Sequence, residues 1–290
     1  MAPQNILIFG ATGQIGSFIL TAVLSARSQF GRVGIFTSPH TAETKAADLE
    51  TLKKRDVEVI VGDVTDENAI KAAYNAAASF SVKWFLPSEY GTDIAYGPAS
   101  AHEKPHQQKL KVRAVLEKEI SRADLNYSYV VTGPFAEMYL HFTPGVEEAG
   151  GWDVKARRAV LLGETGKERT NSVGTLVLAT LLNTTPESRN RPLCVNSFTT
   201  TPAEIQAEFE RQTTGKPWDD VSRTSVERLR ELETAAWEGG NPAATVFTLR
   251  RIWTEGGTLY DQRANGLIGE PNMMTLQEVV ANEIKRVSPL

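Results

Sequence analysis

Short apolar runs alternate with amphipathic stretches along the N-terminal third of the chain. Residues 5–9, Asn-Ile-Leu-Ile-Phe, have the pattern of a strand that is buried on both faces of a parallel sheet. Further strands are predicted at 33–36, 57–61 and 82–86, and helices lie between them at 17–26, 42–54 and 66–78. This alternation predicts βαβ units, and therefore an α/β fold with a doubly wound parallel sheet.

The pattern loosens after the Gly-Pro pair at 133–134. Before this pair, a charged amphipathic helix is predicted over 105–122 and a strand over 127–131. No flexible linker follows, so we expect an N-terminal domain over 1–134 with a smaller C-terminal α/β domain over 135–290 packed against it. The elements predicted in the C-terminal half are a strand at 159–162 and helices at 175–182, 202–212 (with Thr201 as N-cap), 225–237 and 276–287.

Composition narrows the class of protein. The 290 residues are 41% hydrophobic and 23% charged, which supports a sizeable core and excludes wholesale disorder. A net charge of −4 with no basic block argues against nucleic-acid binding. The single cysteine, Cys194, excludes a disulfide scaffold and a cysteine zinc cluster. No apolar stretch approaches the ~20 residues of a membrane helix, and no signal peptide is evident, so we expect a cytoplasmic protein.

A glycine-rich loop directly follows the first predicted strand. Residues 10–16 read Gly-Ala-Thr-Gly-Gln-Ile-Gly and lead into the first predicted helix. In this context Gly10 permits a tight turn, Gly13 lets a pyrophosphate approach the backbone, and Gly16 lets the helix pack closely on the strand. The alternative is a purely structural turn, which the strand–loop–helix context disfavours. The predicted dinucleotide-binding residues are Gly10, Thr12, Gly13, Gln14, Ile15 and Gly16.

The end of the second predicted strand bears on which dinucleotide binds. NAD-preferring sites place Asp or Glu there to hold the ribose hydroxyls. Here residues 37–40 read Thr-Ser-Pro-His without a carboxylate, and Lys45 follows within a turn or two. This favours NADP, with Ser38 donating a hydrogen bond to the 2′-phosphate and Lys45 supplying charge. The alternative for Lys45 is an ordinary solvated lysine.

Two further motifs carry a family resemblance. The strand at 82–86 is followed by Pro87, Ser88, Glu89 and Tyr90, and residues 109–113 read Lys-Leu-Lys-Val-Arg on the charged helix. With the glycine loop and the strand and loop from 127 to Phe135, these segments resemble the isoflavone reductase-like branch of the NmrA-like family. Members of this family are atypical short-chain dehydrogenases with a Rossmann-type fold. The resemblance covers residues 4–216.

The resemblance implies roles for individual residues. It makes Lys109 the general acid/base, with Pro87, Ser88, Lys109 and Phe135 bordering the cofactor. Glu89, Tyr90, Tyr139 and His141 are candidate substrate contacts, although core packing is the alternative for Tyr139, and a structural role is the alternative for His141. On composition alone, Lys109 would be a solvated helix lysine; in a cleft, desolvation would lower its pKa and permit proton transfer.

The resemblance implies an NADPH-dependent oxidoreductase of secondary metabolism that reduces a small aromatic or apolar metabolite, as a monomer or homodimer. The alternative is a non-catalytic NAD(P)-sensing regulator with a protein partner. No metal is expected: His102 and His106 have helical spacing, but Pro105 interrupts it and no third ligand is evident.

One departure from the family is large. Only residues 64–81 separate the third predicted strand from the strand at 82–86, about one strand–helix unit fewer than family members have. We expect residues 82–86 to take the place beside the strand at 6–9, because a gap in the sheet would leave buried backbone groups unpaired. The catalytic segment would then shift inward, and turnover would suffer more than cofactor binding.

Overall fold

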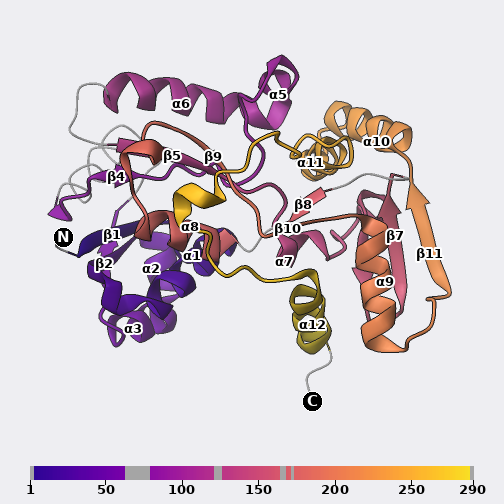
Figure 1. The fold of residues 1–290 in the computed structure, drawn as a ribbon, viewed down its shortest axis with the longest axis horizontal. Coiled ribbons are helices and arrows are strands. Elements are labelled where there is room, and N and C mark those ends of the chain that lie inside the picture. The colour runs from indigo at the N-terminus through magenta and orange to yellow at the C-terminus, as the bar shows by residue number, and fades with distance from the viewer. Residues whose placement is uncertain (1–2, 63–78, 121–125, 164–167, 171–172, 288–290) are drawn as a thin grey trace.

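The computed structural model describes residues 3–62, 79–120, 126–163, 168–170 and 173–287. The predicted helix at 66–78 lies outside these residues. In Figure 1 the N-terminal strands and helices occupy one side of the molecule, and a second group of elements around β7 (Arg158–Leu162), β11 (Asp220–Thr224) and α9 (Pro202–Thr213) occupies the other. The architecture is α/β with parallel sheets, as the sequence predicts.

The first sheet is built from three parallel strands in the order β1-β2-β3. They are β1 (Gln4–Phe9), β2 (Phe30–Thr37) and β3 (Glu58–Val61). Helix α1 (Gln14–Ser25) connects β1 to β2. The predicted strands and the first helix are thus confirmed. The helix predicted over 42–54 is instead two helices, α2 (Pro39–Thr44) and α3 (Ala46–Lys53), because Lys45 has non-helical backbone angles.

The second sheet is also parallel, with the order β4-β5-β9. Its strands are β4 (Trp84–Phe85), β5 (Asn126–Val131) and β9 (Arg191–Cys194). The expected pairing of residues 82–86 with β1 is therefore wrong for the described residues. Strand β4 contributes only two residues to a ladder, and these pair with Asn126 and Tyr127. Its Trp84 indole also donates to Ser128 Oγ at 2.9 Å, which fixes β4 on β5 instead of on β1.

Where the described residues resume, at position 79, the chain lies against the first sheet. The Phe80 ring is fully buried against Gly34 of β2, where an added Cβ would lie 2.4 Å from the ring. The Phe80 carbonyl accepts from Asn5 Nδ2 at 2.9 Å, and the Arg32 guanidinium lies 4.1 Å above the ring. The polypeptide thus crosses from the first sheet to β4 without adding a strand to β1 in the part of the chain that is described.

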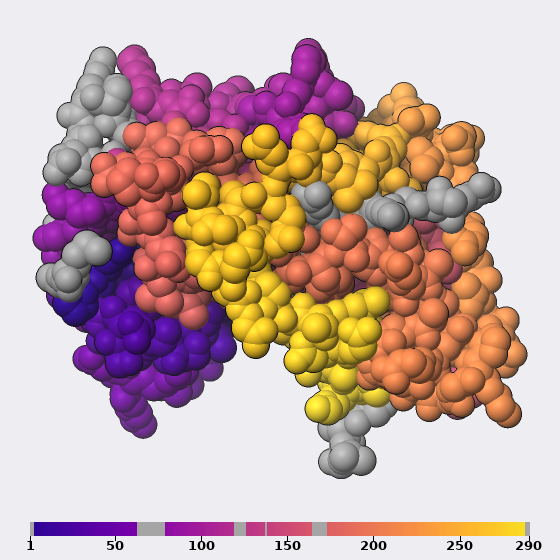
Figure 2. Space-filling view, in the orientation of Figure 1, coloured from indigo at the N-terminus to yellow at the C-terminus, as the bar shows by residue number. Residues whose placement is uncertain are grey.

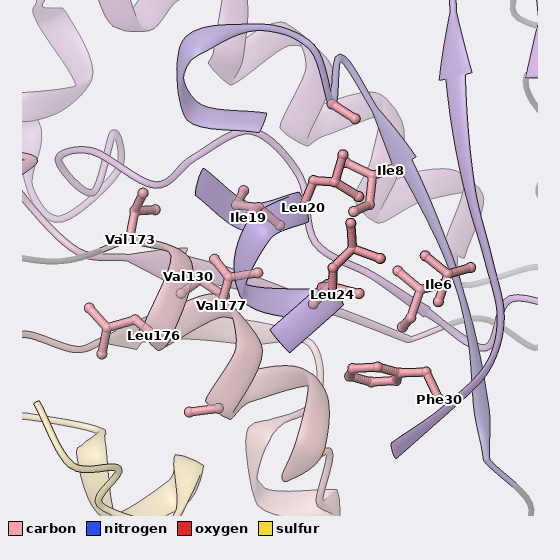
Figure 3. Packing of buried hydrophobic residues seen from close by; sticks show 14 of the residues in the cluster. Ile6, Ile8, Ile19, Leu20, Leu24, Phe30, Val130, Val173, Leu176 and Val177 are labelled. Carbon is pink, nitrogen blue, oxygen red and sulfur yellow. The ribbon is translucent and has the colours of Figure 1, made fainter. Parts of the chain in front are cut away.

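One hydrophobic core joins both sheets. Figure 3 shows Ile8 of β1 beside Leu20 of α1 and Ile6 on the side of Leu24, with Val130 of β5 and Val177 of α8 (Val173–Leu182) in the same cluster. Burial of these side chains contributes about 1.5–3 kcal/mol each. Because α8 and β9 come from the C-terminal half, residues on both sides of position 134 share this core, and the two-domain division stays a prediction.

A second region is built around β7. Strand β7 pairs parallel with β11 and antiparallel with β6 (Gly151–Asp153). A separate antiparallel ladder joins β8 (Glu168–Thr170) to β10 (Phe198–Thr200). Thr201 caps α9 in a reciprocal capping box with Glu204, as predicted. The other helices of this region are α7 (Ala136–Tyr139), α10 (Val226–Glu238), α11 (Ala244–Thr254) and α12 (Leu276–Val287).

The C-terminal segment ties the two regions together. Figure 2 shows it, in yellow, lying between the indigo N-terminal elements and the orange helices. Above the second sheet run α5 (Pro98–His102) and the long α6 (Gln107–Ile120), seen at the top of Figure 1. No described helix has the length and apolar character needed to cross a membrane. Short 3-10 turns complete the structure: η1 (Arg27–Gln29), η2 (Lys104–His106), η3 (Glu147–Ala149), η4 (Pro186–Ser188) and η5 (Asn265–Ile268).

Candidate functional site

The glycine loop has the geometry that its sequence predicts. Gly10 has φ +69°, a left-handed conformation that side chains rarely adopt, and its carbonyl accepts from Gly13 N at 3.0 Å. A Cβ at Gly16 would lie 2.1 Å from the Gly10 carbonyl oxygen, so only glycine lets α1 approach this close to β1. The turn and the close packing therefore require glycines at the two ends of the motif.

The N-terminus of α1 is left without a side-chain cap. Gly13 is the N-cap residue and has an extended backbone at φ −80°, with no side chain to accept from the first-turn amides. The first turn carries no acidic residue. Amides of the first helical turn have no acceptor within the helix, and they favour an anion such as a phosphate. Gly13 and Gln14 are exposed and Ile15 is half-buried, so the uncapped start of α1 is accessible and fits a pyrophosphate.

Ser38 and Lys45 follow β2, and Lys45 reaches the glycine loop. Ser38 caps α2, its Oγ accepting from Thr41 N at 3.2 Å and donating to Thr41 Oγ1 at 3.0 Å. The Lys45 ammonium donates to the Thr12 carbonyl at 2.7 Å, so the break between α2 and α3 brings a positive charge onto the glycine loop. Lys45 is therefore next to the loop in space, although 33 positions separate it from Thr12. Ser38 follows β2, whose Phe36 pairs with Phe9, the last residue of β1 before the loop.

Lys109 joins the segment that follows β4. Its ammonium donates to the Ser88 carbonyl at 2.7 Å, linking α6 to the Pro-Ser-Glu segment. Desolvation lowers the pKa of Lys109 from its ordinary value, and the negative charge of Glu89 opposes that shift. The residue keeps an exposed surface, as does Ser88, whereas Pro87 is buried. A lysine in this setting can both donate and accept a proton nearer neutrality than a solvated lysine can.

Glu89 is buried in an ion pair. Its side chain contacts the guanidinium of Arg113, whose Nε lies 3.1 Å from Oε2, and the same guanidinium reaches Asp93 Oδ1 at 3.2 Å. The Arg113 guanidinium also stacks over the Tyr129 ring at 4.0 Å. This ion pair occupies the Glu89 carboxylate, so the geometry favours a positioning role for Glu89 over contact with a substrate.

Tyr90 and Phe135 border the core shared by the glycine loop. Both pack, partly buried, against the cluster that contains Ala11 and that Ile15 also borders. Burial raises the pKa of the Tyr90 hydroxyl well above its usual range, so this phenol stays protonated. The fold therefore packs these two predicted residues against the same core as the loop.

Tyr139 and His141 belong to the second region. The Tyr139 ring is 2% exposed and lies 6.0 Å from the rings of both Trp152 and Trp253. These buried aromatic surroundings agree with the alternative for Tyr139, which is core packing. The His141 Nε2 lies 2.8 Å from Glu283 Oε2 of α12, an ion pair when the ring is protonated. A substrate role for Tyr139 and His141 remains a proposal.

Sequence reasoning missed the residues that hold the segment after β4. Arg113 stands in the quoted Lys-Leu-Lys-Val-Arg motif, but its spacing from Glu89 gives no local signal of contact. Asp93 and Tyr260 were also missed: Tyr260 Oη accepts from the Asp93 amide at 2.7 Å, across 167 positions. Helical spacing places Arg113 on the same face as Lys109, four residues earlier, but does not indicate which carboxylate it contacts.

A separate polar cleft of about 570 Å³ lies between the α5 end and helices α10 and α11. In it Arg251 binds the carboxylates of Glu103, Glu233 and Glu255. None of the predicted site residues lines this cleft. His102 and His106 each direct a ring nitrogen to a backbone carbonyl, and among the described residues no three His, Cys, Asp or Glu side chains gather as a metal site.

Sequence comparison finds relatives over most of the chain. Residues 2–80 match the NmrA-like family. The chain is 26% identical to the oxidoreductase aprR of Aspergillus flavus, covering 97% of this chain and 99% of that protein. It is 22% identical to the phenylcoumaran benzylic ether reductase Pyrc5 of Pyrus communis, covering 80% of this chain and 82% of that one.

Solved structures share the fold. A leucoanthocyanidin reductase from Vitis vinifera, in a binary complex with NADPH, superposes with a TM-score of 0.74 at 18% identity, covering 97% of this chain and 99% of that one. An isoflavone reductase gives 0.71 at 20% identity, covering 97% and 100%. The Rossmann-type fold expected from the sequence is thereby confirmed. Together these matches support the assignment of the chain to the NmrA-like, isoflavone reductase-like family, the assignment that its three motifs predict.

Proposed function

We propose that this chain is an NADPH-dependent oxidoreductase of isoflavone reductase-like type, with Lys109 as general acid/base and a small aromatic or apolar metabolite as substrate. The relatives include proteins named oxidoreductase and reductase, and a structure of the same fold holds NADPH. The observation that carries the proposal is the Lys109–Ser88 hydrogen bond, which holds an ammonium of lowered pKa at the loop after a parallel strand. Open α/β sheets bind ligands at this edge.

In this proposal the chain's own residues bind and orient. The first-turn amides of α1 hold the pyrophosphate, and Gly13 leaves room for it. Lys45 and Ser38 contact the 2′-phosphate and so prefer NADPH over NADH. When bound, NADPH supplies the hydride.

Lys109 handles the proton that accompanies the hydride. Its ammonium donates that proton to the substrate atom on which negative charge develops, and the Ser88 carbonyl keeps the ammonium oriented. The neutral amine then regains a proton from solvent, which its exposed surface allows. Tyr90 and Phe135 add apolar surface beside the reacting groups.

The test is NADPH oxidation by the purified chain against a panel of phenolic, enone and imine substrates, together with direct measurement of NADPH binding. Turnover that depends on substrate and is lost in Lys109→Met supports the proposal. Binding of NADPH without turnover on any member of the panel contradicts it.

A second candidate is a non-catalytic NAD(P)-sensing regulator that acts through a protein partner. The observation that favours it is the separation of the sheets: β1 pairs only with β2 among the described strands, and β4 pairs only with β5. In the part of the chain that the structure describes, no strand pairs with the second edge of β1, while the glycine loop that follows β1 is intact. Binding without turnover is the result that this candidate expects.

A further inference from the structure

We propose that the buried Glu89–Arg113 ion pair is a positioning device for Lys109, which holds the Ser88 carbonyl against the ammonium and balances the charge beside it. The inference rests on the proposed role of Lys109. It assigns Arg113 as a positioning residue and not as a catalytic one.

The ion pair is buried and has more than one contact. Glu89 is 3% exposed and Arg113 is 8% exposed. Arg113 Nε lies 3.2 Å and 3.1 Å from the two carboxylate oxygens of Glu89, and Nη2 contacts Oε2 as well. Removing one partner of such a pair leaves the other charge buried and uncompensated. The pair is therefore a rigid link between α6 and the segment that follows β4.

The link runs parallel to the Lys109–Ser88 hydrogen bond. On the loop side, Glu89 directly follows Ser88; on the helix side, Arg113 comes four residues after Lys109 and lies on the same face. The two segments are thus joined at two adjacent points, one buried and one exposed. The buried contact sets the distance and orientation at which the exposed contact forms.

Arg113 is itself held from the other side. Its guanidinium stacks over Tyr129 of β5, and the Tyr129 hydroxyl donates to Glu117 at 2.9 Å. Asp93 also accepts from Arg113, at 3.2 Å. The link therefore extends from the sheet through Arg113 to the loop, and a shorter side chain would not reach all of these groups.

Charged and titratable groups lie on each segment that the link joins. The segment after β4 supplies Glu89 and Asp93, helix α6 supplies Lys111 and Arg113, and His106 lies on the turn before the helix with Nδ1 2.7 Å from the Ser100 carbonyl. Glu89 favours the charged form of Lys109, in opposition to desolvation. With Arg113 bound to it, Glu89 exerts only part of that effect, because the two charges offset each other.

Opposite single variants test this balance. Arg113→Gln leaves the Glu89 charge uncompensated and should raise the pKa of Lys109 by about 1 unit, the lower end of the effect of a close opposite charge. Glu89→Gln leaves the Arg113 charge and should lower it. The double variant Glu89→Gln/Arg113→Gln removes both charges and should return close to the parent value.

The readout is the rate of Lys109 acetylation by limiting acetic anhydride, followed by peptide mass spectrometry between pH 6 and 11 on the full-length chain, with Lys111 as internal reference. Shifts of the Lys109 pKa in opposite directions in the two single variants support the inference, because a merely structural role would shift this pKa in the same direction in both variants. Shifts of the same sign, or no shift, in folded variants overturn it.

Folding is followed by circular dichroism and thermal melts. If Arg113→Gln fails to fold, Arg113→Lys and Glu89→Gln decide the matter. Arg113→Lys keeps the charge and should keep the Lys109 pKa near the parent value while slowing turnover, because its single ammonium cannot reproduce the two-point contact. A large pKa shift in Arg113→Lys contradicts the charge balance. The acetylation titration requires no turnover, so failure of the proposed function and failure of this inference remain distinguishable.

Discussion

The Lys109 ammonium donates to the Ser88 carbonyl at 2.7 Å, and this contact joins two motifs 21 positions apart in the sequence. One motif follows a strand of the parallel sheet, and the other lies on the helix that crosses above it. Because of this contact, Lys109 differs from the other lysines of its charged helix. Its amine is held at the edge of the sheet, where open α/β folds bind ligands.

Replacing Lys109 with Met should lower turnover about 10²- to 10⁴-fold, the usual contribution of a general acid/base, and change NADPH affinity little. Methionine keeps the apolar stem and removes the ammonium. Steady-state rates and NADPH titration separate the two effects. The matched control is Lys111→Met on the same helix, also exposed, which should keep the parent rate. A Lys109→Met protein with the parent rate would exclude the assigned role.

Replacing Gly13 with Val should weaken NADPH binding while the protein remains folded. Its φ of −80° suits any residue, and a Cβ would lie 3.3 Å from the Gly10 carbonyl oxygen, a tight contact that a small shift relieves. The added side chain would occupy the approach of the pyrophosphate. Binding by fluorescence titration and the melting temperature are the two measurements.

Gly16→Val is the contrasting variant. A Cβ there would lie 2.1 Å from the Gly10 carbonyl oxygen, so this change should lower the melting temperature strongly in the absence of any ligand. If a folded Gly13→Val protein binds NADPH with unchanged affinity, the glycine loop is not the pyrophosphate site.

Lys45→Ala should remove most of the preference for NADPH over NADH. We expect the parent protein to bind NADPH at least tenfold more tightly, or about 1.4 kcal/mol. Because the Lys45 ammonium also binds the Thr12 carbonyl, the NADH affinity serves as the internal control: it should stay constant if only the 2′-phosphate contact is lost. Lys53→Ala, at the far end of α3, removes the same charge and should keep the preference. Equal affinities in the parent protein would refute this assignment.

Glu283 should contribute to stability above its titration range and lose that contribution in acid. Burial would raise the pKa of this carboxyl, but hydrogen bonds from Arg286 and His141 outweigh it and hold the pKa below its ordinary value. The unfolded chain then takes up a proton first, near pH ~4.3, so stability falls as the pH drops from there through the lower folded value.

Glu283→Gln should therefore be less stable at pH 7 and show a shallower fall of melting temperature between pH 5 and 3. Arg286→Gln, which removes one donor and keeps the carboxyl, should give an intermediate slope. Identical slopes in all three proteins would show that the carboxyl does not couple to folding.

Local patterns determined much of the N-terminal region. The apolar runs of β1, β2, β3 and β5 and the glycine loop before α1 lie where the sequence predicts them, because buried parallel strands and helix starts have signatures within a few residues. The same holds for α9, whose Thr201 and Glu204 form a capping box. The predicted residues of the glycine loop, with Lys45, therefore lie together in space.

Strand partners and the buried ion pair were decided by the tertiary structure. Strand β9 has exposed Arg191 and Pro192 and a single fully buried apolar residue, so its sequence carries no strand pattern, and β11 is almost wholly exposed. Both exist because their backbones pair with β5 and β7. The sequence determined which segments favour a strand or a helix, because that preference is local. The pairing of β4 with β5 instead of β1, and the contact of Arg113 with Glu89, depended on hydrogen bonds and burial between distant residues. No local pattern encodes such contacts.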